Sequence, residues 1–162
     1  MSIDAPAVAP HSDDPLLVEI RAKLAQAPRI HGYYLLRLIR SERTAEVDDS
    51  ARLDWLLEQL DDRPWAPTNA PQDPADGYQV DEATAAAHAV RMLVGGADVG
   101  HARDTMSPAS AESLWTQFRT LFAPSARCFI GLGFGDPAYV FLRGVAVIDD
   151  TRAGYLGVVE SD

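Results

Sequence analysis

The hydrophobic repeat of this chain shortens after Arg127, and that change limits the folds it can adopt. Before this point apolar side chains recur at the helical spacing of three and four residues, most clearly between Ser107-Pro108 and Pro124. The apolar positions of that segment are Ala111, Leu114, Trp115, Phe118, Leu121 and Phe122. After Arg127, short runs of β-branched and aromatic residues alternate with glycine and aspartate turns, which is typical of strands. Helices followed by strands predict an α+β fold.

The predicted strands cover 128–132, 139–148 and 155–159. Turn residues between them indicate an antiparallel meander, so we expect a C-terminal antiparallel sheet of three or more strands. N-terminal and central amphipathic helices should pack on one face of this sheet. The side chains expected in the core are Trp115, Phe118, Leu121, Phe122, Ile130, Val147 and Leu156.

Further helices are predicted in the first half of the chain. One starts at Asp14-Pro15 and ends before Pro28, and another is capped by Asp81 and stops at Gly95-Gly96. A helix between them is indicated by a leucine stripe at Leu53, Leu56, Leu57 and Leu60. The apolar run at 33–40 fits a strand as well as a short helix, and we expect the helix.

The length of 162 residues fits one domain. We expect a flexible tail at 1–13 and a single α+β domain at 14–162. Four prolines between 61 and 79 exclude a regular element there and predict a loop at 61–80. The lone Cys128 precedes an apolar pair, so we expect a buried and unreactive thiol.

The charge balance excludes several classes of partner. There are 24 acidic against 14 basic side chains, a formal net charge of −10, and such a surface repels nucleic acid and anionic lipid. The stretch 1–14 has no positive charge and no apolar run is long enough to span a membrane, so we expect neither a signal peptide nor a membrane anchor. These features predict a cytoplasmic protein.

Two motifs that resemble ligand sites have simpler explanations. The segment 131–135, GLGFG, is followed by Asp136-Pro137 and a strand, whereas a phosphate loop needs a helix there. A hairpin turn explains it, and we expect no cofactor. Three serines, Ser107, Ser110 and Ser113, lie at the start of a helix, where capping accounts for them.

Four other residues form the basis of an alternative, enzymatic reading. His88, Asp98, His101 and Asp104 have the donor types of a metal or small-molecule site. Their spacing matches no specific metal motif, so we expect no bound metal. The alternative holds if the fold brings the four side chains to one point.

An acidic surface with aromatic residues is the leading candidate for function. Between 42 and 62 there are eight acids and two arginines. We expect a protein-binding surface formed by Asp54, Glu58, Asp61, Asp62, Trp65 and Tyr78.

Such a surface fits a basic protein partner, and it is analogous in size and charge to small immunity and antitoxin-like proteins. The function predicted is therefore partner binding without catalysis. Trp65 packed on the core is an equally simple reading of that residue. A second alternative is an assembly subunit, in which the leucine stripe or an edge of the meander pairs with a copy of the chain and makes a homo-oligomer.

Overall fold

The structure is a computed structural model that describes residues 8–10, 14–26, 32–59, 79–95, 106–130, 135–136 and 140–161. The helices are α1 (Pro15–Ala25), α2 (Asp49–Gln59), α3 (Glu82–Gly95) and α4 (Pro108–Arg119). The strands are β1 (Val8–Pro10), β2 (Gly32–Ser41), β3 (Gln79–Val80), β4 (Arg127–Phe129), β5 (Gly135–Asp136), β6 (Val140–Ile148) and β7 (Arg152–Ser161). The predicted α+β class is confirmed.

The strands of the described residues form one seven-stranded antiparallel sheet in the order β1-β2-β7-β6-β4-β3, with β5 also pairing with β6. The predicted meander lies at its centre, because β4 pairs with β6 and β6 pairs with β7. Strands from the first half of the chain extend the sheet on both sides of the meander. Thus β2 pairs along the length of β7, and β3 pairs with β4.

The predicted helix at 33–40 is wrong, because this segment is the middle of β2. Leu36 and Leu38 are buried with α1, α3 and α4, while Leu35 and Ile39 are buried on the opposite face of the sheet. A strand that is covered on both faces reads as a continuous apolar run, without the alternation that would have identified it.

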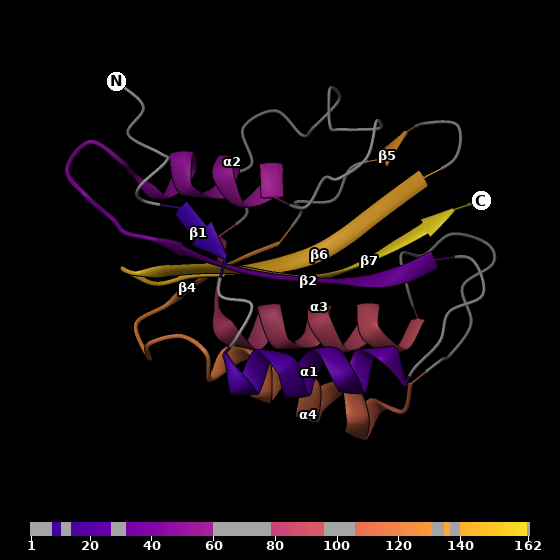
Figure 1. Cartoon of the computed structure of the whole chain (residues 1–162). Coiled ribbons are helices and arrows are strands. Elements are labelled where there is room, and N and C mark those ends of the chain that lie inside the picture. The colour runs from indigo at the N-terminus through magenta and orange to yellow at the C-terminus, as the bar shows by residue number, and fades with distance from the viewer. Residues whose placement is uncertain are drawn as a thin grey trace.

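The expectation that all helices share one face is also wrong. Of the helices that the structure describes, Figure 1 shows α1, α3 and α4 on one side of the sheet and α2 on the other. The helix α2 packs on β2 and β7. Its fully buried Leu53 and Leu56 meet the face of the sheet that carries Leu35, Ile39 and Tyr155. The central strands carry apolar side chains on both faces of the sheet. Each face must therefore be buried by another element.

The main core lies between the sheet and the layer formed by α1, α3 and α4. Of the side chains predicted to be there, six are buried: Trp115, Phe118, Leu121, Phe122, Val147 and Leu156. Ile130 is partly buried and packs against the same core. Gly154 allows this close packing, because a side chain there would overlap the Phe122 ring.

The expected helix starts are observed. Asp14 accepts the amides of Leu16 and Leu17 at 2.9 and 3.4 Å, and Ser107 accepts the amide of Ser110 at 3.1 Å.

Three residues of the expected tail form β1, which pairs with the end of β2. The predicted loop at 61–80 lies outside the described residues except for β3, and so do positions 131–134 of the GLGFG segment.

Candidate functional site

A fully buried arginine, Arg52, fixes α2 to the sheet. Its Nε donates to Ser41 Oγ at 3.2 Å, and its Nη1 donates to Asp49 Oδ1 at 3.1 Å. Its Nη2 donates to the backbone carbonyl oxygens of Ser41, Asp149 and Arg152. Ser41 ends β2, while Asp149 and Arg152 flank the turn between β6 and β7. One side chain thus joins the helix to the ends of three strands.

The carboxylate of Asp49 links Arg52 to a second arginine. Arg127 at the start of β4 donates from Nε to Asp49 Oδ2 at 2.5 Å and from Nη2 to Oδ1 at 3.0 Å. Burial acts to raise the pKa of Asp49, but the hydrogen bonds and charges of the two arginines outweigh it and hold the pKa below its usual value. Arg127 and Asp49 thus form a bidentate ion pair, and charge-assisted bonds of this geometry are among the stronger hydrogen bonds in proteins.

Asp149 organises the turn between β6 and β7. It is 5% exposed, and its carboxylate accepts the amides of Ala123 at 2.9 Å, Thr151 at 2.9 Å and Arg152 at 2.7 Å. Burial acts to raise its pKa, but these backbone hydrogen bonds outweigh burial and lower it.

We call Ser41, Asp49, Arg52, Arg127 and Asp149 the α2 anchor. Its two carboxylates are held ionised by donors, which suits a structural role and not proton transfer.

The outer face of α2 is a row of positions that borders the buried side of the helix, because Asp48 and Trp55 lie four and three residues from the buried Arg52. Positions 48, 51, 55 and 58 follow one line along the helix, because they are spaced by three and four residues. Asp48 is exposed and caps the helix by accepting the Ala51 amide at 3.0 Å. Ala51 and Trp55 are partly exposed.

The acidic segment in front of α2 continues this surface. Glu42 and Glu46 are exposed, and Val47 is buried between them and the helix. The amide of Arg43 donates to the carbonyl of Asp150 at 2.9 Å, so the segment lies beside the turn between β6 and β7. The exposed side chain of Asp150 adds a further carboxylate there.

The predicted partner-binding residues are only partly placed. The backbone of α2 puts positions 54 and 58 one turn apart and on the opposite side from the buried Leu53 and Leu56. Their side chains lie outside the described residues, as do Asp61, Asp62, Trp65 and Tyr78 in full.

Trp55 is a candidate that the sequence analysis missed. It follows Asp54 and lies three residues before Glu58. The leucines on both sides of it belong to the predicted core stripe. The available signal was that position 55 is two residues from Leu53 and one from Leu56, so it does not lie directly above or below either of them along the helix.

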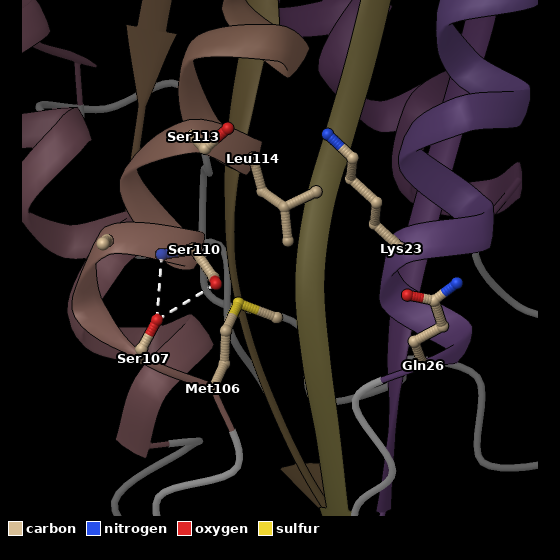
Figure 2. Close-up of a pocket in the computed structure, with 8 residues that line it drawn as sticks. Lys23, Gln26, Met106, Ser107, Ser110, Ser113 and Leu114 are labelled. Atoms are coloured by element: carbon tan, nitrogen blue, oxygen red, sulfur yellow. Dashed lines mark hydrogen bonds between the residues drawn. The ribbon is translucent and has the colours of Figure 1, made fainter.

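A separate cavity of about 580 Å³ lies between the end of α1 and the start of α4 (Figure 2). Its described lining residues are Lys23, Gln26, Met106, Ser107, Ala109, Ser110, Ser113 and Leu114. Three hydroxyls and one ammonium group make its wall polar, whereas Met106 and Leu114 are apolar (Figure 2).

Three of the polar side chains of this cavity, Lys23, Ser107 and Ser110, are already engaged with one another or with neighbours. Ser107 Oγ donates to Ser110 Oγ at 3.0 Å, and Lys23 Nζ donates to Gln117 Oε1 at 2.9 Å. Lys23 also lies 3.5 Å from Glu19. Among the described lining residues there is no histidine, cysteine or carboxylate to activate a serine.

The metal site of the alternative prediction has one described member. His88 lies on α3 and is partly buried, whereas Asp98, His101 and Asp104 lie outside the described residues. Within the part of the chain that the structure describes, no three His, Cys, Asp or Glu side chains are grouped so that they could hold a metal ion.

Cys128 is 3% exposed, and burial raises the pKa of its thiol. Both features agree with the prediction of an unreactive cysteine.

No family profile, curated protein sequence or solved structure matches this chain. None of the helices in the described ranges combines the length and apolar character of a membrane span.

Proposed function

We propose that this protein is a cytoplasmic interaction module that binds a basic protein partner through the outer face of α2 and the acidic segment before it. The observation that carries the proposal is the buried Arg52, which fixes a helix with outward acidic positions firmly to the sheet. A helix held in place before binding loses little conformational entropy when a partner docks.

Charge supports a basic partner. The chain has a net charge of −10, and Glu42, Glu46 and Asp48, just before α2, are exposed. Opposite charge on a partner accelerates encounter and selects against other acidic proteins. An inhibitor of the immunity or antitoxin type works in this way, by covering its target without chemistry.

The proposed surface includes residues whose side chains the structure does not describe. Asp54 and Glu58 belong to it by their helix positions, and Asp61, Asp62, Trp65 and Tyr78 belong to it by sequence proximity. Aromatic side chains close to carboxylates are suited to anchoring a basic partner.

The test is capture of a partner from the native host, followed by binding kinetics at several salt concentrations. Replacing Asp54 and Glu58 by lysine should slow association about tenfold or more at low salt and flatten its salt dependence, because electrostatic steering is lost. The positions lie away from the buried side of α2, so circular dichroism and the unfolding free energy should stay close to those of the parent protein.

A control with the same change in net charge separates a local surface from general charge. Glu19→Lys with Glu112→Lys alters two exposed acids on α1 and α4, which belong to the opposite layer. If this control slows association as much as the α2 variant does, only overall charge matters and the proposed surface is wrong. Equal rates for all three proteins would exclude acidic steering altogether.

A further inference from the structure

We propose that the indole of Trp55 is a cation-binding anchor that stacks against an arginine side chain of the partner. The inference rests on the proposed function and names the chemistry of one contact within it. Trp55 is a large apolar side chain of α2 that is not fully buried, whereas Leu53 and Leu56 on the other side of the helix are completely inaccessible.

The neighbour four residues before Trp55, Ala51, has a small side chain. Helical side chains lean toward the N-terminus, so the indole lies over the turn that contains Ala51. Ala51 is itself partly exposed, and its single methyl group cannot cover an indole. In the proposed contact, the guanidinium group of the partner approaches the exposed part of the indole at this point.

Acidic residues occupy neighbouring positions of the helix. Asp48 is exposed two turns before Trp55 on the same line of the helix, and the acidic positions 54 and 58 flank it. The one basic residue of α2, Arg52, is buried and committed to the α2 anchor. The helix therefore supplies an aromatic ring and negative charge, while its own cation is directed inward.

This combination fits arginine better than lysine. A guanidinium group is planar, so it can stack on an indole and at the same time donate in-plane hydrogen bonds to carboxylates. An ammonium group is compact and strongly hydrated, and it lacks the stacking contact. The site should therefore distinguish two peptides that carry the same charge.

The experiment uses a nine-residue peptide of alternating arginine and glycine, with a matched lysine and glycine peptide, titrated into the full-length ¹⁵N-labelled protein. The indole N–H signal of Trp55, assigned with a Trp55→Phe variant, should shift saturably with the arginine peptide and less with the lysine peptide. Trp55→Leu keeps an apolar side chain without the ring. It should weaken arginine-peptide binding about fivefold and remove the preference over lysine.

The outcomes separate this inference from the proposed function. If Asp54→Lys with Glu58→Lys weakens peptide binding while Trp55→Leu does not, the acidic surface stands and the arginine anchor is wrong. If neither variant changes the affinity for the peptide, the acidic surface and the arginine anchor are both wrong. An unmoved Trp55 indole at saturating arginine peptide overturns the anchor without any variant, so poor folding of Trp55→Leu cannot obscure the result.

Discussion

At the scale of single residues, Gly144 and Tyr155 fit together because one of them has no side chain. Tyr155 on β7 is completely buried, and its ring lies across Gly144 on the neighbouring β6. A methyl group at position 144 would overlap that ring. Among the residues that the structure describes, the phenol hydroxyl has no hydrogen-bond partner, and burial raises the pKa of Tyr155 well above its ordinary value.

Two substitutions at this contact should have opposite effects on stability. Gly144→Ala should lower the free energy of unfolding by about 1–3 kcal/mol, because the ring must move out of a packed face. Tyr155→Phe should leave stability unchanged or raise it by about 1 kcal/mol, because it removes a buried hydroxyl that lacks a partner. Urea unfolding of each variant measures both. A clear loss of stability in Tyr155→Phe would show that the hydroxyl has a partner.

At the scale of elements, α2 depends on polar contacts more than the other helices do. Of the described helices, α2 is the one on its face of the sheet (Figure 1). Arg52 occupies a buried position where a core helix would carry an apolar side chain. The guanidinium donates to backbone carbonyl groups at the ends of β2 and β6, so these strand ends are joined to the helix. The orientation of the helix is therefore set by directional bonds.

Removing this guanidinium should release α2. Arg52→Met should cost about 3–5 kcal/mol of unfolding free energy, because Asp49 loses one of its two arginine partners and the strand-end carbonyls lose the hydrogen bonds from Arg52. Arg52→Lys keeps the charge but not the planar guanidinium group, so its unfolding free energy should lie between those of the parent protein and of Arg52→Met. Hydrogen exchange should show the loss of protection first in α2. Arg21→Met, at an exposed position of α1, is the control, and an equally small effect of both methionine variants would contradict the anchor.

At the scale of the whole molecule, one end of the sheet holds both layers together. The carboxylate of Asp149 accepts a hydrogen bond from the amide of Ala123, beyond the end of α4. The backbone carbonyl of Asp149 accepts one from Arg52 of α2. Arg152 donates to the carbonyl of Leu121 at 3.0 Å from the same turn. The turn between β6 and β7 therefore contacts elements from both sides of the sheet.

This junction should make the protein sensitive to acid. The folded-state pKa values of Asp49 and Asp149 lie below their unfolded values, so the two carboxylates contribute their full stabilisation above about pH 5 and lose it as the pH falls below about 4. Urea unfolding between pH 7 and pH 2.5 should show this decline. In Asp149→Asn the decline should be smaller, whereas Glu112→Gln, at an exposed position, should follow the parent protein. A parent curve that stays flat to pH 3 would contradict the assignment.

The sequence by itself determined the fold class, the helix caps and the central meander. Each of these rests on neighbours that are close along the chain, such as Asp14 with the first turn of α1 and Ser107 with that of α4. Phe118 could be placed in the core for the same reason, because its helical stripe is local.

Only the tertiary structure decided that β2 is a strand, that α2 covers the second face of the sheet and that Arg52 is buried. These features depend on partners remote in sequence: β7 lies alongside β2 and Asp149 accepts from Arg52. The outer position of Trp55 follows in turn from the side of α2 that the anchor holds inward. The structure of an apolar run or of a single arginine depends on the remote residues that hydrogen-bond to it and bury it. The local periodicity of the sequence does not identify those residues.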